Sequence, residues 1–141
     1  MSKKCLCFVL ALLLMVPAVL CFAENDSTDP GQLRYSYINT VSASIRLSGS
    51  TAVCFGNGRG KYTNTTTHLL VTLQRKAPGS ASWSGIKSWS TTTNGIAMAQ
   101  IEESYTITSG YSYRVRVRCQ IKDSSGTVLE TAYRNSASVT Y

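Results

Sequence analysis

The sequence predicts an all-β fold in which two antiparallel sheets pack face to face. The first observation is the segment 111–122, YSYRVRVRCQIK, where apolar side chains alternate strictly with mostly basic ones. Successive side chains of a strand point to opposite faces, so this segment is expected to be a strand with one face in a core. The second is that the chain has about seven such segments in all, at near-regular spacing, and the third is that no helical segment of useful length interrupts them.

The first 23 residues have the three parts of a secretory signal peptide. Two lysines precede an unbroken apolar run over residues 5–16, and a small residue, Ala23, ends the segment. We therefore expect cleavage after Ala23 and a secreted mature chain. The apolar run is too short to cross a bilayer comfortably, and no later segment resembles a span. Lipid attachment at Cys21 is an alternative, but Leu20 stands where a small residue is needed.

Charge is unevenly distributed. The chain has 14 Lys and Arg and 7 Asp and Glu, of which two lysines leave with the signal and three acids lie in the polar segment 24–33. We expect that segment to be a flexible leader. Residues 34–141, the single expected domain, keep 12 basic and 4 acidic residues, a net charge of +8. An exported basic domain favours anionic partners, although basicity also serves solubility.

Alternation places the first two strands and a loop. The first strand is expected from residue 34 to 48, with a break near Asn39, and a tight Gly-Ser turn joins it to a second strand over 51–56. Residues 57–67, NGRGKYTNTTT, are rich in turn formers and are predicted to be a loop. The loop lacks the helix and the Lys-Ser/Thr ending of a phosphate-binding loop.

The remaining strands share the same signal. They are expected at residues 69–74, 83–90, 96–107, 111–122 and 128–141. A bulge is expected at Gly85 in the fourth strand, and the last strand is expected to kink near Asn135. Ala, Met, Gln and Glu favour a helix at the start of 96–107, but that stretch is short and flanked by threonines and glycine, so a strand is favoured.

Two cysteines, Cys54 and Cys119, remain after removal of the signal. They lie on the second and sixth expected strands, in phase with core residues. Two cysteines in an oxidising compartment usually pair, so we predict a disulfide across the two sheets. A pair of free thiols is the alternative.

Several motifs resemble known immunoglobulin-like domains. The sixth expected strand resembles the Tyr-x-Val-x-Val-x-Ala strand of fibronectin type III domains, and 69–75 followed by Trp83 and Ile86 is similar to that family's third strand and its neighbour. The second strand lacks that family's tryptophan, and Val117 replaces the corner tyrosine of immunoglobulin domains. The likeness implies an immunoglobulin-like sandwich over residues 34–141.

A closer resemblance rests on the motifs RYSYI, LQRK and GYSYRVRV and on the two tryptophans of the fourth strand. The chain resembles small secreted proteins of Gram-positive bacteria that are grouped as a domain of unknown function. This resemblance implies a fold and a compartment, and it implies no activity.

Catalytic signals are weak. His68 is the only histidine, and no motif links it to an acid for a nucleophilic triad. Glu102 and Glu103 are adjacent on a strand, so they point to opposite faces and would not flank one glycosidic bond. One histidine and two cysteines expected to pair leave no metal cluster. We therefore expect no enzyme, cofactor or metal, with a small hydrolase as the remote alternative.

The basic stripe Arg114, Arg116 and Arg118 is the first candidate binding feature. Guanidinium groups bind phosphates and carboxylates as planar forks, so the stripe could hold an anionic polymer. The alternative is a solvated strand face. Glu130, on the neighbouring last strand, is the expected internal partner of the stripe.

Aromatic residues are the second candidate. Trp83 and Trp89, with Tyr62 in the nearby loop, could form a platform on which sugars stack, although tryptophans in sandwiches usually cover a core or an edge. Asn25 and Asn64 head glycosylation sequons, which matter only in a eukaryotic source.

Together these observations predict a secreted, non-enzymatic binding or adhesion module at the cell envelope or a host surface. Its expected partner is an anionic cell-envelope polymer or glycan, and no specific nucleic acid is expected. The alternative is an inhibitor or immunity-type protein that binds a secreted or surface protein through loops at one end of the sandwich.

Overall fold

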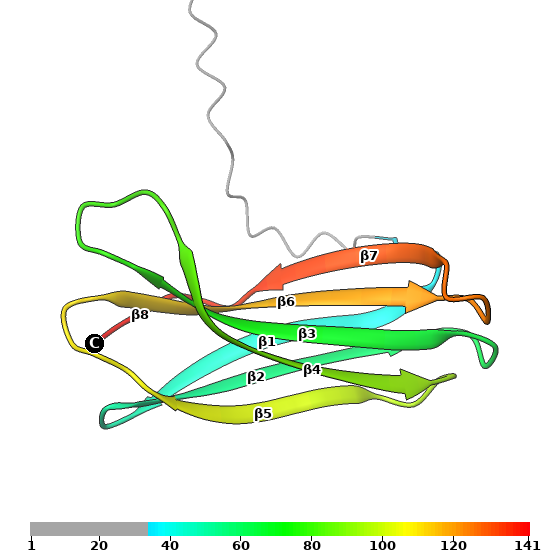
Figure 1. Cartoon of the computed structure of the whole chain (residues 1–141), viewed down its shortest axis with the longest axis horizontal. Helices are drawn as coiled ribbons and strands as arrows, with labels where there is room; N and C mark the ends of the chain where they lie inside the picture. The colour runs from blue at the N-terminus through cyan, green and yellow to red at the C-terminus, as the bar shows by residue number, and fades with distance from the viewer. Residues whose placement is uncertain (1–33) are drawn as a thin grey trace, which may run out of the picture. The chain divides into compact units, whose positions relative to one another are not determined.

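A computed structural model describes residues 34–141, and the expected signal peptide and leader lie outside these residues. Within them the regular elements are all strands, which confirms the all-β prediction (Figure 1). The strands are β1 (Ile38–Ser48), β2 (Thr51–Gly60), β3 (Thr66–Lys76), β4 (Ser84–Asn94), β5 (Ala99–Thr106), β6 (Ser112–Lys122), β7 (Val128–Asn135) and β8 (Val139–Thr140). The described part of the chain offers no helix that could cross a membrane.

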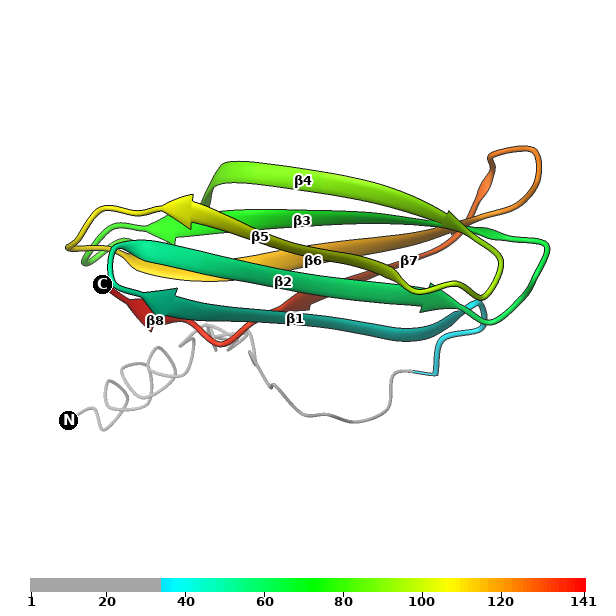
Figure 2. The same cartoon turned by 90° about the horizontal axis from the view of Figure 1, so that it is seen from below.

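The strands form a two-layer sandwich, seen from its side in Figure 2. One sheet has the order β1-β2-β5, and the other has the order β4-β3-β6-β7, with β8 also pairing with β6. All pairs are antiparallel. In immunoglobulin domains the first, second and fifth strands share one sheet, and the third, sixth and seventh share the other. The two-sheet sandwich is as predicted, and these six strands are divided between the sheets as in immunoglobulin domains, whereas β4 pairs with β3 rather than joining the sheet of β1, β2 and β5 as in constant-type domains.

β6 has the two faces that its alternation predicted. Its buried side chains are those of Tyr113, Val115, Val117, Cys119 and Ile121. They pack with the inward side chains of β3, which are Leu69, Val71 and Leu73. The hydroxyl of the buried Tyr113 is hydrogen-bonded, because it donates to the Thr108 carbonyl at 2.7 Å. The central strand was thus placed correctly from its period alone.

The predicted loop over residues 57–67 is wrong in its first part. β2 continues to Gly60, and only residues 61–65 turn before β3 begins. Gly56 and Gly58 face the opposite sheet: a Cβ at Gly56 would lie 2.5 Å from Cγ2 of Val71, and one at Gly58 would lie 2.7 Å from Sγ of Cys119. These glycines therefore serve close packing between the sheets rather than flexibility.

The predicted disulfide is also wrong, because Cys54 and Cys119 are buried free thiols. The sulfur of Cys119 packs against the Gly58 position, which is four residues along β2 from Cys54. A strand rises about 3.3 Å per residue, so this offset is roughly 13 Å. Disulfide geometry needs Cα atoms within about 7 Å. Both cysteines point inward as expected, but at different levels of the core.

The irregularities of the strands follow the sequence closely. The β1–β2 register shifts between Ile38 and Thr40, at the predicted break. The β3–β4 register shifts where Gln74 pairs with Gly85, as the glycine indicated. Residues 99–106 form β5 rather than a helix, and the last strand divides into β7 and β8 after Asn135.

Candidate functional site: the outer face of the five-stranded sheet

The outer face of the five-stranded sheet includes outward side chains of β4, and its central part is formed by the side chains of β3, β6 and β7 that point away from the core. Register and burial assign to it His68, Leu70, Thr72, Gln74, Lys76, Arg114, Arg116, Arg118, Gln120, Lys122, Thr131, Tyr133 and Asn135. We call this surface the basic face. Five of its members are Lys or Arg, and none is Asp or Glu. The predicted stripe of three arginines therefore emerges together, as the parity of β6 requires.

Arg114 is held in place by two neighbours. Its Nε donates to Oε1 of Gln74 at 2.8 Å, and its guanidinium carbon lies 4.3 Å from the ring centroid of Trp83. Lys76 approaches the same ring, with Nζ 5.0 Å from the centroid. Cations over the face of an aromatic ring are attracted by its quadrupole. Trp83 thus joins this end of the basic face, next to the first arginine.

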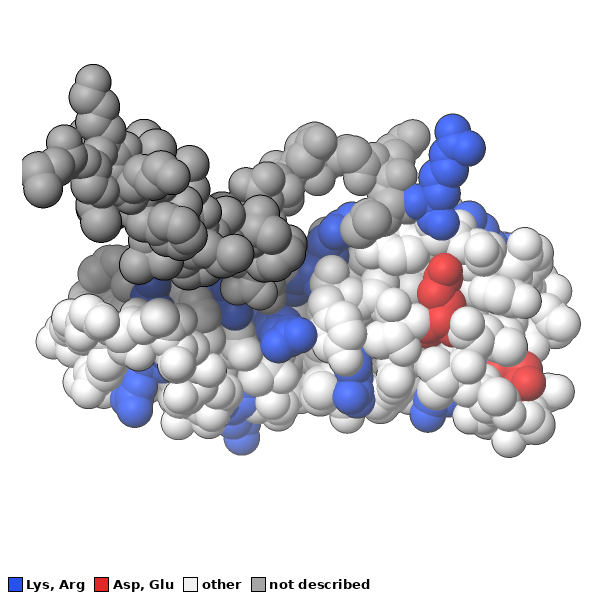
Figure 3. Space-filling model, turned by 90° about the horizontal axis from the view of Figure 1, so that it is seen from above, with Lys and Arg blue, Asp and Glu red and all other residues white. Residues whose placement is uncertain are grey.

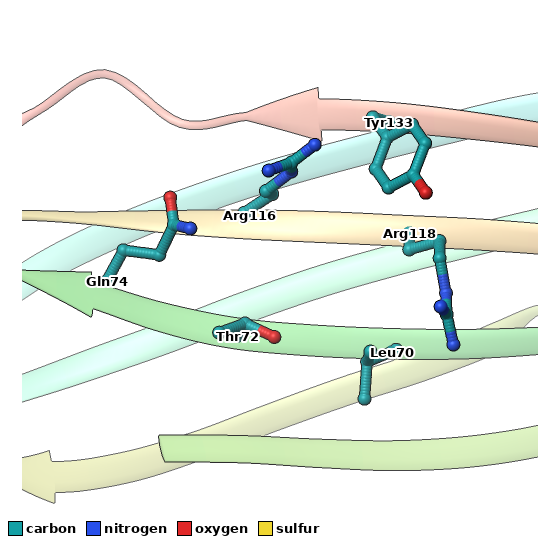
Figure 4. Close-up of a pocket in the computed structure, with 6 residues that line it drawn as sticks. All are labelled: Leu70, Thr72, Gln74, Arg116, Arg118 and Tyr133. Atoms are coloured by element: carbon teal, nitrogen blue, oxygen red, sulfur yellow. The ribbon is translucent and has the colours of Figure 1, made fainter. Parts of the chain in front are cut away.

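Arg116 and Arg118 border an open depression of about 250 Å³, lined by Leu70, Thr72, Gln74, Arg116, Arg118 and Tyr133. In Figure 4 the side chain of Arg116 extends toward β7 and that of Arg118 toward β3. The Arg116 guanidinium lies 4.6 Å from the Tyr133 ring centroid. Arg118 is the cross-strand partner of Leu70, and its Nε is buried without a hydrogen-bond partner among the described residues.

The acids of residues 34–141 lie away from this depression or are occupied. Glu102 pairs with Arg46 at 3.2 Å on the other sheet, the only ion pair between described residues. The Asp123 carboxylate accepts the backbone N–H groups of Ser125 and Thr127, each at 2.9 Å. Figure 3 shows Lys and Arg along the length of one side of the molecule, with acidic groups toward one end.

The local potential is positive enough to affect the one histidine. Burial is the largest cause that lowers the pKa of His68, and the charges of Lys122 and Arg118 lower it further. Like charges disfavour the protonated imidazole. Its Nδ1 lies 3.1 Å from Oγ1 of Thr92.

Glu130 does not neutralise the stripe, so that expectation is wrong. It is the register partner of Ile121, whose side chain is buried, and therefore lies on the inward side of β7. Its carboxylate accepts the backbone N–H groups of Ser36, Tyr37 and Ile38 at 2.9, 2.8 and 2.7 Å. The carboxylate thus ties the segment before β1 to β7 in the opposite sheet.

The structure does not bring the three predicted stacking residues together. Trp83 lies beside Arg114, whereas Trp89 pairs with Val71 and packs against the core. Tyr62 lies in the β2–β3 turn, at the opposite end of β3 from Trp83, and its ring packs edge-on against Tyr37 with centroids 5.6 Å apart. Of this set, only Trp83 belongs to the basic face.

A second depression, of about 310 Å³, contains His68 together with Lys122 and Asp123. No hydrogen bond joins His68 to Asp123 in the described structure, and the turn's own donors occupy that carboxylate. No group of three potential metal ligands occurs within residues 34–141. The geometry offers His68 a threonine contact rather than a catalytic partner.

Sequence reasoning missed Tyr133, Gln74 and Leu70. Tyr133 and Leu70 are the cross-strand neighbours of Arg118, and Gln74 is the neighbour of Arg114. These residues could be found only from the register between strands, which alternation within one strand does not specify.

No family model and no curated protein matches the sequence. Among solved structures, the chain is similar to a β-glucosidase from Kluyveromyces marxianus, with 8% identity, a TM-score of 0.40, and coverage of 70% of this chain and 14% of that one. It is also similar to the sporulation control protein Spo0M from Bacillus subtilis, with 11% identity, a TM-score of 0.39, and coverage of 72% of this chain and 49% of that one. A third similar structure is OgpA from Akkermansia muciniphila, with 12% identity, a TM-score of 0.33, and coverage of 72% of this chain and 29% of that one. The chain therefore spans less than half the length of each. Likenesses at these scores carry no argument about function.

Proposed function

We propose that this chain is a secreted, non-enzymatic binding module whose basic face recognises an anionic polymer or glycan at the cell envelope or a host surface. The observation that carries the proposal is the placement of Arg116 and Arg118 on an outward face with no carboxylate among its described residues. The expected signal peptide supports export, and it brings the module to where such polymers occur.

Electrostatics supports an external anion. Alternate residues of a strand stand about 7 Å apart, which is within the Debye length of about 8 Å at physiological salt. Arg116 and Arg118 therefore repel each other unless an opposite charge lies near. The ring of Tyr133 relieves this in part, because it attracts Arg116 without neutralising it. A guanidinium that stacks on a ring still has in-plane N–H groups available to an oxyanion.

The test replaces the two arginines at the depression. Arg116→Gln with Arg118→Gln removes two charges and spares Arg114, which supports Gln74 and Trp83. The double variant should bind purified envelope material more weakly than the parent, with a flatter dependence on salt, because fewer counterions are exchanged on binding.

A matched control removes two charges elsewhere. Arg46→Gln with Lys87→Gln changes two exposed residues outside the basic face. This control should bind like the parent. Equal losses in both double variants would mean that net charge, and not the basic face, governs binding, and unchanged binding in the first variant would refute the proposal.

A second candidate, a protein-binding inhibitor, is favoured by a different observation. The exposed large aliphatic side chains of residues 34–141 are Ile96, Met98, Val128 and Leu129. They lie at the β4–β5 turn and at the start of β7, at one end of the sandwich (Figure 2). Because β4 and β7 are opposite edge strands of the five-stranded sheet, the four side chains form two separate exposed pairs, and each offers apolar surface to a protein partner. Ile96→Ser with Met98→Ser should abolish capture of a protein partner that salt does not elute, and should leave polymer binding unchanged.

A further inference from the structure

Each arginine of the stripe lies beside an apolar group on the same face. Arg114 stacks on Trp83, Arg116 stacks on Tyr133, and Arg118 is the cross-strand partner of Leu70. Charge and apolar surface therefore alternate in small units along β6, about 7 Å apart. A ligand that offers charge alone, such as a polyphosphate, would contact the arginines and leave their apolar neighbours without a partner.

The apolar groups remain accessible. Tyr133 is 49% exposed even with Arg116 against its ring, and Leu70 is only half-buried on the outer side of β3. Both line the depression of about 250 Å³ (Figure 4). Aromatic rings and aliphatic side chains bind the C–H face of a sugar ring through apolar contact, and they gain nothing from a phosphate.

Beside the two arginines, the depression has uncharged polar groups that are already positioned. The Thr72 hydroxyl shares a hydrogen bond of 2.9 Å with the Ser88 hydroxyl. Oε1 of Gln74 accepts from Arg114, which directs the amide NH2 of Gln74 to serve as a donor. Fixed hydroxyl and amide groups suit sugar hydroxyls, and their prior positioning reduces the entropy lost on binding.

From this geometry we propose that the ligand of the basic face is a carboxylated oligosaccharide that lies along β6. Its carboxylates bind Arg116 and Arg118, the C–H face of an acidic sugar contacts Tyr133 and Leu70, and its hydroxyls reach Thr72 and Gln74. Arg114, Lys76 and Trp83 extend the same combination along the strand, so a longer chain binds more tightly than a single sugar. This inference rests on the proposed function and specifies its ligand class.

The test compares three soluble probes by titration calorimetry: oligogalacturonates of one to six units, their methyl esters, and a polyphosphate of matched charge. The unesterified oligosaccharides should bind more tightly as their length increases. The methyl esters, which keep the sugar and lose the charge, should bind at least about tenfold more weakly, and so should the polyphosphate.

Two variants separate charge from apolar contact. Tyr133→Ala and Leu70→Thr keep every arginine, so each should weaken oligogalacturonate binding by roughly threefold to tenfold and leave polyphosphate binding unchanged. Tyr105→Ala is the control, because Tyr105 is an exposed tyrosine on β5 in the other sheet. Both test residues are at least partly exposed, and the melting temperature of each variant verifies its fold.

The outcomes distinguish the choice of a carboxylated oligosaccharide as ligand from the broader proposal that the basic face binds an anion. If the polyphosphate binds as tightly as the oligosaccharides, and Tyr133→Ala changes neither, the ligand is a phosphate polymer; the inference is then wrong and the proposed function stands. If neither anion binds the parent protein, both are wrong. Length-dependent binding of the carboxylated chains, lost on esterification and weakened by Tyr133→Ala, supports both.

Discussion

β2 and β6 are interior strands of opposite sheets and share one pattern, in which every second residue is buried. Their inner faces are complementary in size. β2 presents small groups that include Gly56 and Gly58, and β6 presents Tyr, Val, Cys and Ile. Their outer faces differ in charge. Near β2 the exposed Arg46 is paired with Glu102, whereas Arg116 and Arg118 of β6 have no carboxylate among the described residues of their face.

The inward and outward residues of an alternating strand therefore have different explanations. The inner residues of both strands are explained by packing, because each fills space left by the other. Arg114 contacts Gln74 and Trp83, but the core does not require arginine at positions 116 and 118, where threonine would also suit a strand. The outward residues of β6 are therefore the ones to examine for function.

The largest expected effect comes from breaking the size complementarity. In Gly56→Ala the new Cβ would meet Cγ2 of Val71 at 2.5 Å and Cγ2 of Val117 at 2.7 Å. Valine side chains are stiff, so the sheets must separate, at a cost of about 1–3 kcal/mol in the free energy of unfolding. Chemical denaturation measures this. Ser44→Ala, on the exposed side of β1, should change it by less than about 0.5 kcal/mol.

The two thiols test the relative level of β2 and β6. Burial raises the pKa of Cys54 to about 11, and burial with the charge of Glu130 raises the pKa of Cys119 to about 11. Two units above the value of 9.0 mean about 100-fold less thiolate at neutral pH. Alkylation of the protein, purified without reductant, should therefore be slow in the folded state and should label both cysteines in the unfolded state. A mass that shows no label on the unfolded protein would mean that the two cysteines form a disulfide after all.

Glu130→Gln should weaken the link between the two sheets. The amide has one acceptor oxygen in place of a carboxylate that receives three backbone donors. Charge-assisted bonds are stronger than neutral ones, so the variant should lose about 1–3 kcal/mol of stability at pH 7. Glu103→Gln, an exposed acid on β5, is the control and should lose nothing measurable.

The pH dependence of stability provides a check on the same carboxylate. Burial raises the pKa of Glu130, but the backbone donors Ser36, Tyr37 and Ile38, with Lys61, outweigh it and hold the pKa below the ordinary 4.5. Such a group stabilises the fold above pH 4.5, and the contribution is lost as pH falls through the lower, folded-state pKa. Parent stability should fall in this acid range more steeply than that of Glu130→Gln. Parallel curves would contradict the role of the carboxylate.

The smallest effect is expected on the outer faces. Arg116→Gln with Arg118→Gln should leave the free energy of unfolding within about 0.5 kcal/mol of the parent, since Arg116 is exposed and the buried Nε of Arg118 has no hydrogen-bond partner to lose among the described residues. Arg46→Gln, which breaks the surface pair with Glu102, should do the same. A large loss in the first variant would mean that the arginines are structural.

The sequence allowed prediction of the sandwich, the parity of β6 and most bulges, because a period of two and a glycine are local signals. It did not allow prediction of anything that depends on register between strands. The level of Cys54 against Cys119 and the side on which Glu130 lies are both of this kind. In β7 the small or apolar residues Leu129, Ala132 and Tyr133 do not alternate, so its parity could not be read from the chain.

The glycines of β2 led to the wrong prediction of a loop from residue 57, also because contacts between strands were unknown. Glycine is a turn signal when only neighbours along the chain are known. Its use in β2 became clear only when Val71, Val117 and Cys119 of the other sheet were placed opposite it. The placement of the three arginines on one outward face was predicted correctly, but their apolar partners come from other elements, namely β3, β7 and the segment before β4.

The most direct test of the central claim is to map the bound surface residue by residue. Amide chemical shifts of the isotopically labelled protein would be followed by NMR during titration with an oligogalacturonate. Binding at the basic face should move the signals of Gln74, Arg116, Arg118 and Tyr133, and should leave those of Arg46 and Phe55 on the other sheet unchanged. Shifts centred on β1, β2 and β5, or on the end loop at Ile96, would contradict the account.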